Sequence, residues 1–171
     1  VPCRIRFDPL PHPPPIKTKR PPTVIQNLIT GGAGFVGSHL AEALLQNGEA
    51  VTIIDDLSTG AIRNLDPVRS HPHLTVHIGN IMDVPQMTEL VDRADRVWHL
   101  AAAVGVRLIV EKPVHTIETN IRGTEIVLSL AARKQRRLLL TSTSEVYGKS
   151  TRVPFAEQDD LVFGSTTRPR W

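Results

Sequence analysis

The sequence LITGGAGFVGSHL, residues 28–40, decides the fold together with VTIID, residues 51–55. These stretches place three features in a fixed order: an apolar strand, a glycine-rich turn that opens a helix, and a second apolar strand that ends in a carboxylate. A dinucleotide-binding unit requires this order, so the sequence predicts such a site here.

The glycines satisfy two related spacings, G-x-x-G-x-x-G at positions 31, 34 and 37 and G-x-G-x-x-G at positions 32, 34 and 37. Without Cβ atoms, Gly31, Gly34 and Gly37 let the backbone turn sharply, approach a pyrophosphate and pack the helix closely on the strand. The N–H groups at the start of that helix face the phosphates, and the helix dipole favours negative charge there.

Asp55 closes the second strand about 20 residues after the glycine turn, where a carboxylate accepts hydrogen bonds from the adenosine ribose hydroxyls. A carboxylate at this position repels a 2′-phosphate, so the sequence favours NAD over NADP. Arg63 follows shortly after and keeps that preference moderate.

Length and composition favour one soluble globular domain. The 171 residues suffice for one core, 40% of them are hydrophobic and 22% are charged. No apolar run approaches the roughly 20 residues of a membrane span. Cys3 is the one cysteine, so no internal disulfide can form, and we expect a reducing compartment, the cytoplasm.

The net charge of +3 comes from the N-terminal segment. Five basic residues and one acidic residue give residues 1–26 a charge of +4, so the remaining chain carries −1. We therefore do not expect a nucleic-acid partner. Residues 1–26 also hold 8 of the 14 prolines without apolar periodicity, which predicts a disordered, basic extension; a proline-rich ligand for a partner domain is the alternative.

From residue 27, strands alternate with helices. Further strands are expected at residues 50–54, 74–78, 96–101 and 137–142, helices at 85–93 and 113–133, and a polar loop with room for a short helix at 56–70. This alternation predicts an α/β fold, a Rossmann-type doubly wound parallel sheet with helices on both faces. Because residues 137–142 contain a continuous apolar run, Leu138-Leu139-Leu140, we expect that strand to be covered on both faces.

The helices have predicted apolar faces. In the first helix, which Gly48 ends as the C′ residue, the face consists of Phe35, Val36, Leu40, Ala43 and Leu44. In the helix at 113–133, the residues available for burial are Ile117, Ile121, Ile126, Val127 and Leu130.

Five motifs then occur in order: TGGAGFVGSHL (30–40), DDLSTG (55–60), HLAA (99–102), NIRGT (120–124) and TSTSEVYG (141–148). Together they resemble the extended short-chain dehydrogenases/reductases, which are NAD-dependent epimerases, dehydratases and decarboxylases of nucleotide sugars. The resemblance covers residues 27–171 and implies an NAD-binding Rossmann domain, incomplete at its C-terminus, that acts on a nucleotide sugar, with a UDP-sugar favoured.

The resemblance also implies the residues that bind the cofactor. The glycine turn would hold the pyrophosphate and Asp55 the ribose, while Asn80 stands where the family commonly has an aspartate near the adenine. Asn120 resembles a helix asparagine near the site, and a solvated surface residue is the alternative reading. The implied cofactor residues are Gly31, Gly34, Phe35, Val36, Gly37, Asp55, Asn80, Ile81, Leu100, Ala101, Ala102 and Asn120.

Thr143, Ser144 and Glu145 are the candidate catalytic residues. The resemblance implies that Thr143 orients the sugar oxygen that is oxidised, and a strand-end threonine chosen for β propensity is the alternative. The dehydratases carry Asp-Glu after this threonine, so Ser144-Glu145 disfavours dehydration. The segment instead resembles UDP-glucuronate decarboxylases, in which these two residues would assist loss of the carboxylate from a 4-keto sugar. Epimerases can share these residues.

The sequence departs from the family at its general base, a Tyr-x-x-x-Lys pair whose lysine lowers the pKa of the tyrosine. Tyr147 is the only tyrosine and has no lysine four residues later. We therefore expect a truncated chain, whose full-length relative is a homodimeric enzyme. The alternative is a non-catalytic NAD-binding fragment or pseudoenzyme.

Histidines give no strong prediction of a metal site. His71, His73 and His77 have suggestive spacing, but the first two flank Pro72 in a polar loop and no cysteine lies nearby, so a solvated loop is expected. His39 and His99 fall within the family motifs at packing positions, so we expect both to be hydrogen-bonded core residues.

Overall fold

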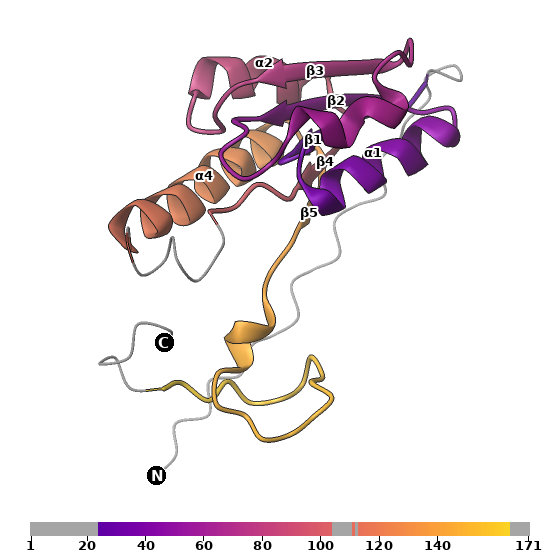
Figure 1. The fold of residues 1–171 in the computed structure, drawn as a ribbon. Helices are drawn as coiled ribbons and strands as arrows, with labels where there is room; N and C mark the ends of the chain where they lie inside the picture. The colour runs from indigo at the N-terminus through magenta and orange to yellow at the C-terminus, as the bar shows by residue number, and fades with distance from the viewer. Residues whose placement is uncertain (1–23, 104–110, 112, 165–171) are drawn as a thin grey trace.

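The computed structural model describes residues 24–103, 111 and 113–164 of the chain. Within them, five strands form one parallel sheet in the order β3-β2-β1-β4-β5 (Figure 1). The strands are β1 (Gln26–Thr30), β2 (Ala50–Asp55), β3 (Leu74–Ile78), β4 (Arg96–His99) and β5 (Arg137–Leu140). The strand order runs outward from β1 in both directions, so the predicted doubly wound α/β fold is confirmed.

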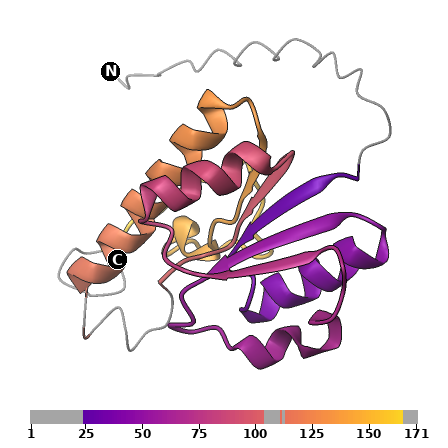
Figure 2. The same cartoon turned by 90° about the horizontal axis from the view of Figure 1, so that it is seen from above.

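The helices are α1 (Phe35–Gln46), η1 (Ile62–Val68), α2 (Val84–Arg93), α4 (Pro113–Arg133) and η2 (Ser144–Tyr147). Figure 2 shows α1 and η1 on one face of the sheet and α2 and α4 on the other. Neighbouring residues of β1 serve different layers, because Ile29 joins the cluster under α1 and η1, and Leu28 joins the cluster under α2 and α4. Both clusters are buried, which explains why the central strands are apolar without alternation.

The predicted element bounds agree closely with the structure. Residues 74–78 and 113–133 form the strand β3 and the helix α4 as predicted, and η1 is the short helix inside the polar loop. The strands expected at 96–101 and 137–142 end two residues early, at His99 and Leu140. Gly48 follows the C-cap of α1 with a φ of +76°, so its predicted role as the C′ glycine is confirmed.

The predicted apolar face of α1 was wrong at its N-terminal end. Leu44 is buried as expected, but Phe35 is 78% and Val36 61% exposed, and the helix buries Ala41 and Leu45 instead. The first turn of α1 stands at the carboxyl edge of the sheet, so its side chains reach past the strands rather than onto them. Ala43 is exposed and Leu40 is half-buried.

The predicted burial along α4 and β5 is also corrected. Val127 and Leu130 are buried, whereas Ile117 and Ile121, on the N-terminal half of α4, are 57% and 66% exposed. Figure 1 shows the reason, because the N-terminal part of α4 extends past the strands of the sheet. At the outer position of the sheet, β5 leaves Leu139 and Leu140 exposed instead of covered on both faces.

Residues 1–23 lie outside the described residues, so the disorder predicted for residues 1–26 stays a prediction. Residues 141–164 leave the sheet after β5 and contain η2, beside which the rings of Tyr147 and Phe155 stack at 4.6 Å between centroids. In the described part of the chain, no helix has the length and apolarity that crossing a membrane requires.

Candidate dinucleotide-binding site

The glycine turn is packed too closely to accept side chains. Gly31 has a φ of +72°, and a Cβ on it would lie 2.8 Å from the backbone nitrogen of Ala101. A Cβ on Gly37 would collide with the carbonyl oxygen of Gly31 and lie 2.7 Å from the Cα of Gly32. The turn is thereby pressed between α1 and the end of β4, as the predicted role of these glycines requires.

The start of α1 presents unused hydrogen-bond donors. Gly34 is the N-cap residue and supplies no side chain to cap the helix. Because the first N–H groups of any helix have no acceptor within it, the first turn, Phe35 to Gly37, offers backbone donors and the positive end of the helix dipole to a ligand. This is the arrangement that binds phosphate groups at helix N-termini.

Asp55 at the end of β2 holds the glycine turn. Its Oδ2 accepts a hydrogen bond of 2.9 Å from the backbone N–H of Ala33, and its Oδ1 accepts one of 2.8 Å from the N–H of Leu57. The side chain is 8% exposed. A carboxylate has about four lone-pair sites, so each oxygen retains one for a further donor.

The loop after β2 closes over the turn through Asn64, a residue that the sequence analysis missed. The carbonyl oxygen of Ala33 accepts hydrogen bonds from the Asn64 side chain at 2.8 Å and from the Ala61 N–H at 3.0 Å. A Cβ on Gly60 would lie 3.0 Å from the same oxygen, which is tighter than an ordinary van der Waals contact. No sequence signal marked Asn64, because its partner is 31 residues away.

A second polar contact joins Asn80, which follows β3, to Asp56, which follows β2. The Asn80 side chain donates to Oδ2 of Asp56 at 3.3 Å, and its Oδ1 accepts from the Met82 N–H at 2.9 Å. Neighbouring Ile81 is 7% exposed and belongs to the core cluster under α2 and α4. The loop after β3 is thereby tied to the loop after β2.

Asn120 of α4 points to the backbone of the segment after β4. Its Oδ1 accepts from the Ala103 N–H at 2.7 Å and its amide donates to the Ala103 carbonyl at 3.1 Å. The Asn120 side chain is thus engaged by backbone, and the cofactor role that the resemblance implies for it stays a prediction. The Asn120 side chain holds the backbone of Ala103, which lines the cavity described below, but Asn120 itself does not line it.

These elements enclose a cavity of about 870 Å³ at the carboxyl edge of the sheet, between the loops after β1, β2, β3 and β4. All the predicted cofactor residues except Asn120 line it. Lining residues that the analysis did not single out include Ile54, Asp56, Ser58, Thr59, Gly60, Gly79, Ala103, Glu111 and Thr119. The cavity has the size of typical small-molecule sites, about 300–1,000 Å³, and lies where the strand order reverses.

Thr143, Ser144 and Glu145 do not line this cavity. They form the exposed start of η2, where Oγ1 of Thr143 accepts a hydrogen bond of 3.2 Å from the Glu145 N–H. Figure 1 shows η2 displaced from the sheet along the segment that follows β5. The described residues thus do not bring the candidate catalytic residues to the cavity, and their role stays a prediction.

The two motif histidines differ. The prediction for His39 was wrong, because it is exposed and its ring packs edge-to-face on Phe35 at 4.9 Å between centroids. His99 is 2% exposed and hydrogen-bonded at both ring nitrogens, as predicted. Burial lowers its pKa from the ordinary value. Among the described residues, no group of three or more histidine, cysteine or acidic side chains is arranged to hold a metal ion.

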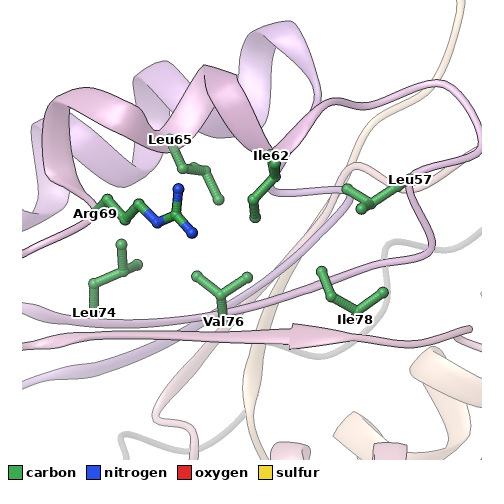
Figure 3. A pocket seen from close by; sticks show the side chains of 7 residues that line it. All are labelled: Leu57, Ile62, Leu65, Arg69, Leu74, Val76 and Ile78. Carbon is green, nitrogen blue, oxygen red and sulfur yellow. The ribbon is translucent and has the colours of Figure 1, made fainter.

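A smaller hollow of about 470 Å³ lies between η1 and β3 (Figure 3). Apart from Arg69, the residues that line it are aliphatic: Leu57, Ile62, Leu65, Leu74, Val76 and Ile78. It therefore offers little of the hydrogen-bonding capacity found in the larger cavity.

Comparisons with known proteins agree with this geometry. A decarboxylase from Bacillus cytotoxicus, UDP-N-acetyl-alpha-D-glucosaminuronate decarboxylase, is 45% identical over 148 residues, which is 84% of this chain and 44% of that protein. UDP-glucuronic acid decarboxylase 1 from Xenopus tropicalis is 37% identical over 85% of this chain and 33% of that protein. The chain thus spans less than half the length of these relatives.

A solved dTDP-glucose 4,6-dehydratase from Streptomyces venezuelae, with NAD bound, superposes with a TM-score of 0.76 at 31% identity, over 81% of this chain and 46% of that one. Residues 28–165 match the family described as GDP-mannose 4,6 dehydratase. This match spans most of the chain and includes the glycine turn and Asp55. The chain therefore belongs to the GDP-mannose 4,6 dehydratase family, among the NAD-dependent epimerases, dehydratases and decarboxylases that its sequence resembles.

Proposed function

We propose that this chain binds NAD in the cavity at the carboxyl edge of the sheet, as the cofactor-binding part of a nucleotide-sugar enzyme. The observation that carries the proposal is the glycine turn, in which a Cβ on Gly31 or Gly37 would strike backbone and whose Ala33 is hydrogen-bonded to Asp55. The residues present fit a dinucleotide, because backbone donors, a close backbone approach and a carboxylate line one cavity.

Different residues of the cavity would bind the pyrophosphate, the ribose and the adenine of NAD. The first turn of α1 and the glycine turn would hold the pyrophosphate, and the lone pairs that Asp55 retains would accept the ribose hydroxyls. Asn80 and Asp56, joined at 3.3 Å, would border the adenine. Asn120 contributes indirectly by holding Ala103.

The charges of the cavity support NAD over NADP. Asp55, Asp56 and Glu111 line it, and no lysine or arginine does so among its described lining residues. A 2′-phosphate would be repelled by the Asp55 carboxylate, which lies where the ribose hydroxyls would bind. Arg63, which the sequence analysis weighed against this preference, is exposed and does not line the cavity.

The test is calorimetric titration of the 171-residue protein with NAD and, in parallel, with NADP. We expect saturable NAD binding that is at least about tenfold tighter than NADP binding, a difference of about 1.4 kcal/mol. Absence of saturable NAD binding would refute the proposal, and equal affinity for the two would refute the role assigned to the carboxylates.

For the whole enzyme, the substrate we favour is UDP-glucuronate and the reaction is decarboxylation through a transient 4-keto sugar. Both decarboxylases described above support the reaction, as does Ser144-Glu145 in place of Asp-Glu, and the relative from Xenopus tropicalis supports the substrate. When bound, NAD supplies the hydride acceptor and donor. Thr143 would position the sugar oxygen at C4, and Ser144 and Glu145 would assist departure of the carboxylate as carbon dioxide.

The second candidate function is NAD binding without catalysis. It is favoured by the position of η2, whose residues lie outside the cavity lining. Incubation with NAD and UDP-glucuronate, with carbon dioxide release as readout, separates the two candidates. We expect NAD binding without turnover by these 171 residues, and sustained carbon dioxide release would establish the enzymatic candidate. The predicted homodimer and cytoplasmic location stay predictions.

A further inference from the structure

His99 stands at the end of β4 with both of its ring nitrogens engaged by threonine side chains. Its Nδ1 lies 2.7 Å from Oγ1 of Thr30, at the end of β1, and its Nε2 lies 3.1 Å from Oγ1 of Thr124, on α4. His99 is 2% exposed and Thr30 is fully buried. The ring therefore joins three separate elements of the fold inside the core.

One protonation state satisfies every partner in this cluster. Oγ1 of Thr30 already accepts the Ala101 N–H at 3.2 Å, so its hydroxyl proton is free to be donated to Nδ1 of His99. The proton on Nε2 is then donated to Thr124. In the opposite tautomer, Thr30 would receive two donors while its own proton faced no acceptor among its described partners. Burial, which lowers the pKa of His99, also favours the neutral ring.

This bridge lies directly beneath the cavity. Thr30 precedes Gly31, and Ala101 lines the cavity at the point where a Cβ on Gly31 would lie 2.8 Å from its nitrogen. One turn before Thr124, Asn120 holds Ala103. Two side chains on the same face of α4 therefore fix both ends of the segment 99–103, in which residues 100–103 form one wall of the cavity.

We propose that His99 is a positioning residue of the dinucleotide site: a neutral, Nε2-protonated bridge that sets the spacing between the glycine turn and the wall formed by residues 100–103. The bridge deepens the function proposed above and rests on it for its effect on NAD. His99 is not among the lining residues of the cavity, so it acts through Thr30 and Ala101.

Two conservative variants each keep one of the two side-chain hydrogen bonds of His99. In His99→Asn, the amide oxygen takes the place of Nδ1 and can still accept from Thr30. In His99→Gln, the longer side chain brings its amide nitrogen to the place of Nε2 and can still donate to Thr124, while the link to Thr30 is lost. We expect the NAD dissociation constant to rise about tenfold in the glutamine variant and by less than about threefold in the asparagine variant.

The matched control is Val127→Ala, which removes buried volume from α4 in the core cluster beneath that helix without touching the bridge or the cavity lining. It should lower the melting temperature and leave the NAD dissociation constant unchanged. If the glutamine and asparagine variants also melt earlier but bind NAD as the wild type does, His99 is a packing residue and the proposal is wrong.

A second measurement does not depend on NAD. Long-range proton–nitrogen NMR of the wild type identifies the protonated ring nitrogen, and above the ordinary histidine pKa of about 6.5 we expect the neutral Nε2–H tautomer for His99. The Nδ1–H tautomer or an imidazolium would overturn the bridge. If the wild type fails to bind NAD while the Nε2–H tautomer is observed, the proposed function fails and the bridge stands.

Discussion

Replacing Asp55 with asparagine changes one atom in the carboxylate that ties β2 to the glycine turn. The oxygens accept from Ala33 at 2.9 Å and from Leu57 at 2.8 Å, and the contact with Ala33 is buried. Asparagine keeps one acceptor and turns an NH₂ group toward the other N–H, so two donors face each other. A hydrogen bond to a charged group contributes about 1.5–3 kcal/mol to folding stability. Because Asp55→Asn loses one such bond, we expect it to destabilise the fold by about 2 kcal/mol.

That loss lowers the melting temperature by about 4–8 °C for a domain of this size. The NAD dissociation constant should rise about tenfold, because the ribose loses a carboxylate acceptor, whereas NADP binding should weaken less. The assay is thermal unfolding followed by titration with each dinucleotide. Asp66→Asn is the control, since it removes the same charge from an exposed ion pair of 3.8 Å, which contributes little to stability. If both variants match the wild type in stability and NAD affinity, Asp55 does not hold the turn.

Three further predictions follow from the same geometry. Gly37→Ala should abolish measurable NAD binding in a titration, because its Cβ collides with the Gly31 carbonyl; binding within about threefold of the wild type would contradict the packing described. Asn64→Ala should weaken NAD binding by about threefold to tenfold, since one of the hydrogen bonds to Ala33 is lost, and unchanged affinity in the same titration would exclude this role. Because burial lowers the pKa of His99, the unfolded chain binds a proton at this residue more readily than the folded chain does. The contribution of the neutral ring to stability is therefore present above about pH 6.5 and is lost as the pH falls through the folded-state pKa. Denaturant unfolding at several pH values should show that the free energy of unfolding depends less steeply on pH in His99→Asn than in the wild type.

The architecture could be predicted from the sequence because its signals are local. Gly31 follows the first apolar strand, and Asp55 ends the second. The alternation of such strands with helical patterns is enough to predict a parallel sheet with helices on both faces, whatever the details of packing. The glycine spacing predicted the closely packed turn for the same reason, since the absence of a Cβ is a property of each residue alone. Even the C′ role of Gly48 depends on nothing beyond its own backbone.

Exposure was harder to predict where an element reaches past its neighbours. Phe35 and Val36 satisfy the helical period but stand at the edge of the sheet, and Ile117 and Ile121 lie on the part of α4 that extends past the strands. A periodic pattern identifies an apolar face but does not state how far the opposite layer extends. That extent follows from the lengths of all the strands together.

The sequence by itself determined the class of fold, the place of the glycine turn and the carboxylate that follows it. The tertiary structure alone decided which atoms those residues engage: Asp55 holds the Ala33 amide, Asn64 holds the Ala33 carbonyl, and Asn120 holds Ala103. The partners are 17 to 31 residues apart in the chain. Hydrogen bonds act over about 3 Å, so a contact between such distant positions exists only once the strands and helices have packed.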